Sequence, residues 1–187
     1  LEKGADELIK VNDLSPMAEA FRILITNMNF MLPKKKGKVV FVTSTVKGEG
    51  KTFVSVNLAL TIASPSKKTI IIGSDIRNPQ LQRYNTARKG LMGLTEFLND
   101  ENVKLEEIVH PSSFNKNLDV IYSGSIPPNP TDLLSNGKYE TLVETLKEKY
   151  DYIILDTAPL MLVTDSFLIS EVADITLYVT RSKYTEK

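Results

Sequence analysis

The sequence contains no cysteine and only one histidine, which narrows the chemistry that the chain can carry. Without cysteine, neither a disulfide nor a thiolate metal site can form, and the composition fits a reducing cytoplasm. The one histidine, His110, precedes a proline in a polar stretch. We interpret it as a surface loop residue rather than a metal ligand.

The chain also lacks an excess of charge of either sign and any long hydrophobic run. Lys plus Arg and Asp plus Glu number 23 each in 187 residues, and this zero net charge argues against a nucleic-acid surface. No apolar stretch approaches the ~20 residues of a membrane span, and no signal peptide is visible. Because the chain does not begin with methionine, we expect a soluble fragment cut from something larger.

Short apolar runs alternate with helical patterns, which is typical of an open α/β sheet. Four nearly all-apolar runs predict parallel strands covered on both faces, and a fifth strand is expected at 118–124. The four runs lie at 39–42, 69–72, 152–155 and 175–179. Helices are predicted at 15–32, 52–63, 94–99, 104–109, 131–149 and 165–172. We therefore predict a doubly wound, mostly parallel α/β domain over 38–187, preceded by a helical arm over 1–37.

A phosphate-binding loop is predicted between the first strand and the helix after it. The stretch T-V-K-G-E-G-K-T at 45–52 meets the pattern G-x-x-x-x-G-K-[ST] except at its first position, where Thr45 stands. Gly48 and Gly50 allow the tight bend that turns backbone N–H groups toward an anion. Lys51 can then reach the β- and γ-phosphates, and Thr52 can give a hydroxyl to Mg²⁺.

A carboxylate is predicted to join this loop from another strand. The run Y-I-I-L-D ends in Asp156, at the carboxyl end of an apolar strand. Ligands in open α/β sheets bind at the carboxyl ends of the strands, so this side chain and Thr52 should converge. Asp156 can then hold Mg²⁺ through water.

Five segments, in this order, resemble the motifs of bacterial tyrosine kinases (BY-kinases), the cytoplasmic domains of polysaccharide co-polymerases. They are an N-terminal oligomerisation helix, a Walker A loop, a Walker A′ segment, a Pro-rich segment, and a Walker B strand with its following loop. The corresponding stretches read SPMAEAFRILITN, TSTVKGEGKT, IIIGSDIRNP, SGSIPPNPTDLL and YDYIILDTAPLMLVTD. The resemblance covers nearly the whole chain.

The resemblance implies a P-loop fold, tyrosine autophosphorylation with Mg-ATP, and control of capsular or exopolysaccharide export and chain length. It implies ATP or ADP contacts from Lys47, Gly48, Glu49, Gly50, Lys51, Thr52, Phe53 and Arg77. It places Mg²⁺ near Thr52, Asp75 and Asp156, with Lys51, Asp75 and Asp156 as catalytic residues. A surface ion pair is the alternative for Arg77.

The resemblance also implies partners and a location. Glu19 and Arg22 would form contacts in a ring of identical subunits. A transmembrane co-polymerase segment, in the same or a partner chain, would hold the domain at the cytoplasmic side of the bacterial inner membrane. No nucleic-acid partner is implied.

Three departures from the family pattern bear on activity. The Walker A′ segment of the family carries Asp-x-Asp, but here Gly73 takes the place of the first acid, which is thought to position or deprotonate the tyrosine hydroxyl. Ile25 replaces the second arginine of the helix motif E-x-x-R-x-x-R. The Tyr-rich tail is missing: only Tyr184 lies near the end, while Tyr139, Tyr150 and Tyr152 are interpreted as packing or surface residues.

Three functions therefore remain open. The first is a tyrosine kinase, active or weakened. The second is a partition or division-site ATPase switch, a class that carries a lysine at the position of Val46, whereas Lys47 is one residue off that register. The third is a pseudokinase that binds nucleotide and couples its occupancy to assembly.

Overall fold

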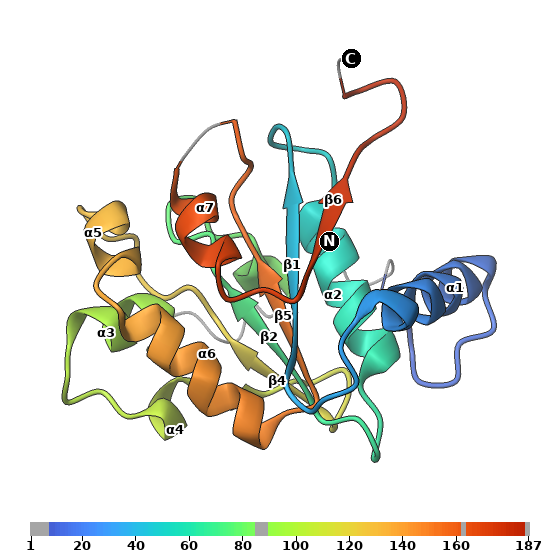
Figure 1. Ribbon diagram of the computed structural model, residues 1–187, viewed down its shortest axis with the longest axis horizontal. Coiled ribbons are helices and arrows are strands. Elements are labelled where there is room, and N and C mark those ends of the chain that lie inside the picture. Colours follow the sequence, from blue (N-terminus) through green and yellow to red (C-terminus); the bar gives the residue numbers. More distant parts are fainter. Residues whose placement is uncertain (1–7, 85–89, 162–163, 186–187) are drawn as a thin grey trace.

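A six-stranded sheet forms the centre of the molecule (Figure 1). The computed structural model describes residues 8–84, 90–161 and 164–185. The strands are β1 (Lys38–Ser44), β2 (Thr69–Gly73), β3 (His110–Pro111), β4 (Leu118–Ile121), β5 (Tyr152–Asp156) and β6 (Ile175–Val179), in the order β3-β4-β2-β5-β1-β6. Every neighbouring pair is parallel except β3 with β4, so the predicted mostly parallel sheet is confirmed.

Helices cover both faces of the sheet, as predicted for a doubly wound fold (Figure 1). One face is covered by α1 (Pro16–Met31) and α2 (Lys51–Ile62). The other is covered by α3 (Leu94–Asn99), α4 (Leu105–Ile108), α5 (Pro130–Leu134), α6 (Lys138–Lys149) and α7 (Asp165–Ser170). A short 3₁₀ helix, η2 (Leu81–Tyr84), follows the segment after β2.

The core consists of two apolar clusters, one on each face of the sheet. Along β1, Val40 and Val42 contribute to the cluster under α1 and α2, while Val39 and Phe41 contribute to the opposite one. Successive side chains of a strand point to opposite faces, so an all-apolar strand fills both layers. The continuous apolar runs in the sequence therefore have a direct structural cause.

The N-terminal helix begins and packs as its sequence predicts. The Ser15 hydroxyl accepts a hydrogen bond from the Ala18 N–H at 3.2 Å, and Pro16 is the first helical residue. Phe21 meets Phe53 of α2 edge to face, with 6.4 Å between ring centroids. The helix thus shares a cluster with the sheet, and the division of the chain at 37/38 stays a prediction. None of the helices in the described ranges has both the length and the hydropathy that a membrane crossing requires.

Four predicted features are wrong in detail. The expected helix 131–149 is interrupted between α5 and α6, because Gly137 takes a left-handed φ of +85°. The fifth strand ends at Ile121 rather than at residue 124. His110 belongs to β3, paired with Val120, instead of a loop. β6 is an edge strand of alternating half-buried and exposed residues, not a strand covered on both faces.

Candidate nucleotide-binding site

The predicted loop joins β1 to α2 in a conformation that depends on two glycines. Gly48 has φ +94° and Gly50 has φ +97°, which other residues rarely adopt. Gly50 caps α2, whose first turn leaves backbone N–H groups without partners inside the helix. Such N–H groups and the positive helix end form a cradle for anionic phosphate.

Neighbouring strands bring the predicted polar residues to the same edge of the sheet. β5 lies between β1 and β2, so Asp156 is paired in register with both Val42 and Gly73. The Lys51 ammonium, at the start of α2, lies 3.9 Å from an oxygen of Asp75, and both side chains are buried. The predicted convergence of Asp156 with the phosphate loop is therefore seen in the structure, and Asp75 lies beside them.

Asp156 lies close to this pair and is held by hydroxyl groups. The Ser55 hydroxyl donates to its carboxylate at 3.1 Å, and the Thr52 side chain is also hydrogen-bonded to it. Burial raises the pKa of Asp156 to about 6, although Lys51 and the two hydroxyls act to lower it. Burial likewise raises the pKa of Asp75. Two buried carboxylates therefore share one lysine, which leaves this buried cluster of three side chains short of positive charge.

A divalent cation fits this shortage of charge. In the part of the chain that the structure describes, no group of three or more His, Cys, Asp or Glu side chains could hold a metal ion alone. Mg²⁺ commonly takes one or two protein carboxylates and completes its shell with water and substrate phosphates. Thr52, Asp75 and Asp156 match this arrangement.

The raised pKa of Asp156 predicts a pH-dependent stability without nucleotide. Its pKa rises from 3.8 to about 6 on folding, so unfolding releases a proton between these values. The free energy of unfolding therefore falls as the pH rises through this window. It remains at the lower value at every pH above the window. We expect Asp156→Asn to stabilise the nucleotide-free protein by about 1–3 kcal/mol near pH 7.5, and not near pH 4.

Urea unfolding of the wild type and variant at these two pH values measures the effect. Asp132→Asn, which removes an exposed acid from α5, serves as the matched control and should change stability little at either pH. An Asp156→Asn protein that is less stable than the wild type at neutral pH would contradict the assignment.

A cavity of about 480 Å³ opens above these side chains. Among the predicted residues, Lys47, Gly48, Gly50, Lys51, Thr52, Asp75 and Arg77 line it. The remaining lining residues are Asn78, Gln80, Arg83, Ala158, Pro159 and Arg181, which were not predicted. Five cationic side chains and one carboxylate thus face the cavity, as suits a polyphosphate.

Glu49 and Phe53, also predicted at the nucleotide, do not line this cavity. The Glu49 carboxylate is buried and accepts a hydrogen bond from the Val46 N–H at 2.9 Å, so it braces the loop. The Phe53 ring packs against Phe21 of α1. Only its backbone N–H, in the first turn of α2, is placed to meet a phosphate.

Arg77 lines the cavity and forms the ion pair that was its alternative role, while its contact with nucleotide stays a prediction. Its guanidinium binds Asp165 at 2.5 and 3.1 Å and also donates to the Thr131 hydroxyl at 2.9 Å. Asp165, the first residue of α7, is buried and was not assigned a role from the sequence. The ion pair with Asp165 fixes the Arg77 guanidinium at the cavity wall.

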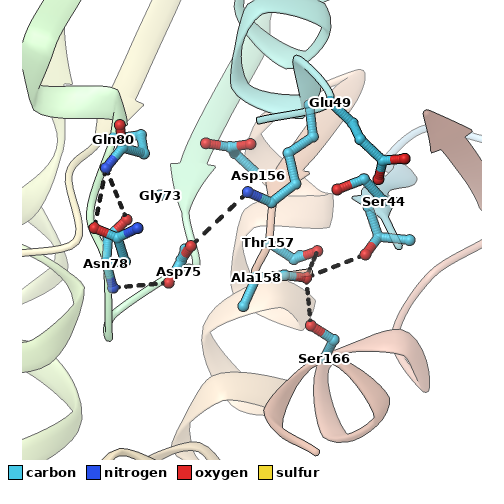
Figure 2. Close-up of polar contacts among 12 residues, drawn as sticks. Ser44, Glu49, Gly73, Asp75, Asn78, Gln80, Asp156, Thr157, Ala158 and Ser166 are labelled. Carbon is cyan, nitrogen blue, oxygen red and sulfur yellow. Dashed lines mark hydrogen bonds and ion pairs between the residues drawn. The ribbon is translucent and has the colours of Figure 1, made fainter. Parts of the chain in front are cut away.

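Hydrogen bonds involving side chains hold the cavity walls beside Asp75 and Ala158 (Figure 2). The Asn78 N–H donates to Asp75 at 2.9 Å, and Gln80 donates to the Asn78 side chain at 3.1 Å. The Ala158 carbonyl accepts from the hydroxyls of Thr43 at 3.1 Å and Ser166 at 2.8 Å. The site is thus preorganised by several elements rather than by the loop alone.

Gly73 has no space for the missing acid. A Cβ atom there would lie 2.7 Å from the Ser123 hydroxyl and 3.1 Å from the Ser123 backbone nitrogen. That hydroxyl donates to the Gly73 carbonyl at 2.6 Å and is buried. The space beside β2 is therefore filled by Ser123, two residues beyond the end of β4.

Of the three α1 positions that correspond to the family's oligomerisation motif, only Glu19 and Arg22 lie at the surface. Arg22 and Glu19 form an exposed i, i+3 ion pair at 3.2 Å, and Arg22 also donates to the Asp13 carbonyl. Ile25, at the position of the second family arginine, is buried against the α2 side of the core. Its apolar side chain belongs to the interior of the chain and cannot replace a charged contact.

The strand–loop–helix unit, its lysine and the two strand-end carboxylates define a P-loop nucleotide-binding protein. A family model described as "AAA domain" matches residues 37–185. The tyrosine-protein kinase CpsD of Streptococcus pneumoniae is 36% identical over 178 residues, covering 95% of this chain and 77% of the relative. The chain belongs to the bacterial tyrosine-protein kinase family.

Solved structures agree with this assignment. The kinase domain of the Escherichia coli tyrosine kinase ETK matches with a TM-score of 0.83 and 30% identity, over 90% of this chain and 65% of that one. The cell division ATPase MinD of Pyrococcus furiosus matches with a TM-score of 0.64 and 22% identity, over 76% of this chain and 59% of that one. The second likeness supports a common fold alone.

Proposed function

We propose that this chain is the core of a Mg-ATP-dependent protein-tyrosine kinase. The observation that carries the proposal is that Lys51, Thr52 and Asp75 line one cavity, with Asp156 buried against Lys51 and Thr52. The loop and Lys51 would hold the phosphates, and Thr52, Asp75 and Asp156 would hold Mg²⁺. Bound Mg²⁺ supplies charge stabilisation to the transferred phosphoryl group. The chain's own residues would position the phosphates and neutralise their charge. For this role Asp75 holds Lys51, and Asp165 holds Arg77.

The wider role follows from the family resemblance. We infer that the kinase contributes to capsular or exopolysaccharide export and chain length, and acts at the cytoplasmic side of the bacterial inner membrane. A transmembrane co-polymerase segment would be its membrane partner. Assembly through Glu19 and Arg22 would need other contacts than the second arginine, since Ile25 is buried.

A nucleotide-binding regulator without transfer activity is the second candidate, and Gly73 is the observation that favours it. Asp75 is the one carboxylate among the residues that line the cavity in the described part of the chain. A pseudokinase would retain the nucleotide contacts of Lys51 and the loop. It would differ from a kinase only in the fate of the γ-phosphate.

The two candidates are separated by a transfer assay. The protein is incubated with Mg-ATP and a tyrosine-containing tail peptide, and phosphotyrosine is mapped by mass spectrometry. We expect phosphotyrosine on the peptide, together with saturable binding of ATP. ATP binding without any phosphotyrosine would favour the regulator, and ATP-dependent dimerisation without transfer would favour the ATPase switch.

A further inference from the structure

The segment that follows β6 is attached to the phosphate loop at three successive residues. The Tyr184 hydroxyl donates to the Lys47 carbonyl at 3.0 Å, and the Arg181 guanidinium donates to the Gly48 carbonyl at 3.2 Å. The Thr185 hydroxyl donates to the Glu49 carboxylate. We name residues 181–185 the strap.

The strap is itself a compact turn. The N–H groups of Tyr184 and Thr185 both donate to the Arg181 carbonyl, at 3.1 and 3.0 Å, and Lys183 has a φ of +62°. The Arg181 guanidinium lies over the Tyr184 ring, 5.3 Å from its centroid. Because these side chains support one another, loss of one loop contact should loosen the others.

The strap touches the loop at Gly48, one of its two glycines with a left-handed φ. The Tyr184 hydroxyl lies 2.7 Å from the position that a Cβ atom of Gly48 would take. Gly48 and Arg181 both line the cavity. The strap binds the carbonyls of Lys47 and Gly48, and the neighbouring backbone N–H groups of the loop therefore remain free to bind an anion. In this way the strap preorganises the loop for phosphate.

Tyr184 is also one of the few tyrosines that a kinase could reach. Of the seven tyrosines, Tyr122, Tyr139, Tyr150 and Tyr152 are buried, and Tyr84 is partly buried against the core. Tyr178 and Tyr184 are about half exposed, at 50% and 49%. The Tyr178 hydroxyl bonds the Thr45 side chain from the rigid frame of β6, whereas Tyr184 lies on the turn beyond that strand.

We propose that Tyr184 is a modification site, and that its phosphorylation detaches the strap from the phosphate loop and weakens nucleotide binding. The proposal rests on the proposed function for the source of the phosphate, which is ATP held by a second copy of the chain. The transfer joins the Tyr184 oxygen to the γ-phosphorus and breaks the bond from that phosphorus to the β,γ-bridging oxygen. ADP leaves, and the phenolic proton passes to solvent.

The physical effect follows from the contacts. A phosphate ester has no hydroxyl proton to donate to the Lys47 carbonyl, and it brings a charge of about −2 against the carbonyl oxygens of Lys47 and Gly48. The dianion also competes with the Gly48 carbonyl for Arg181. The strap must therefore leave the loop, and the loop loses the support that shaped it.

The binding test uses phosphotyrosine installed at position 184 during synthesis of the chain, so it does not depend on the chain's own activity. Titration with a fluorescent ADP analogue should show at least a tenfold rise in Kd. Tyr184→Phe, which removes one hydrogen bond without adding charge, should raise Kd about two- to fivefold. Phosphotyrosine at position 178 is the matched control and should have the smaller effect. An unchanged Kd with phosphotyrosine at 184 would overturn the proposal.

The transfer test mixes wild-type donor with a Lys51→Met acceptor and Mg-ATP. Phosphotyrosine on residue 184 of the acceptor is the expected result. Phosphate on other tyrosines but not on Tyr184 would overturn this inference. The absence of phosphotyrosine throughout the mixture would instead overturn the proposed function.

Discussion

Replacing Lys51 with methionine should reduce phosphoryl transfer by about 10²–10³-fold, because it removes the buried positive charge that we propose binds the transferred phosphate. Lys51 is 7% exposed and lies 3.9 Å from Asp75, so water cannot readily replace its charge. Methionine keeps the length of the side chain and its contacts along the stem. Nucleotide affinity should fall as well, and calorimetry of ATP binding beside the peptide-transfer assay measures both effects.

Lys47→Met is the matched control for this prediction. Lys47 also lines the cavity, but it is exposed on the outer part of the loop, and its loss should change transfer less than about tenfold. A Lys51→Met protein that stays folded and keeps transfer activity would contradict the role of Lys51. Equal losses in the two variants would show that the cavity responds to net charge rather than to a placed cation.

The parts of the site that lie within one segment could be predicted from the sequence. Gly48, Gly50, Lys51 and Thr52 are neighbours along the chain, so the strand–loop–helix pattern fixes their relative positions. The convergence of Asp156 could also be predicted, because parallel strands present their carboxyl ends at the same edge. Local pattern and sheet topology were sufficient for this half of the site.

The other half depends on contacts between distant segments. Arg77 and Asp165 are 88 residues apart, and Glu49 meets Thr185 across 136 residues. No spacing rule connects such pairs, because each depends on how two loops pack after the sheet has formed. The same reason explains why the strap and the Ser123 contact were missed, although each residue was visible in the sequence.

The identity of Gly73 was visible in the sequence, but its consequence was not. The missing acid suggested a simple loss that one substitution could reverse. The structure places the Ser123 hydroxyl 2.7 Å from the required Cβ atom, so Gly73→Asp alone forces a buried group to move. We expect the single variant to be destabilised by about 1–3 kcal/mol, with little gain in transfer.

Gly73→Asp combined with Ser123→Ala should increase phosphoryl transfer by about tenfold or more, since a positioned general base commonly contributes about 10²–10⁴-fold. Alanine removes the hydroxyl that fills the space, and only the 3.1 Å contact with the residue 123 backbone nitrogen remains to be relaxed. The new carboxylate extends from the end of β2 beside Asp156, its partner in the parallel register. It therefore stands at the same edge of the sheet as the existing acids.

Gly73→Asn with Ser123→Ala separates charge from shape in this experiment. The amide has the same size as the carboxylate but cannot accept the tyrosine proton as a base, so this pair should show no gain. Initial rates with the tail peptide, measured at saturating Mg-ATP, compare the two pairs, and urea unfolding reports their stability. Equal rates in the Asp and Asn proteins, both folded, would mean that the acid lost at Gly73 does not limit transfer.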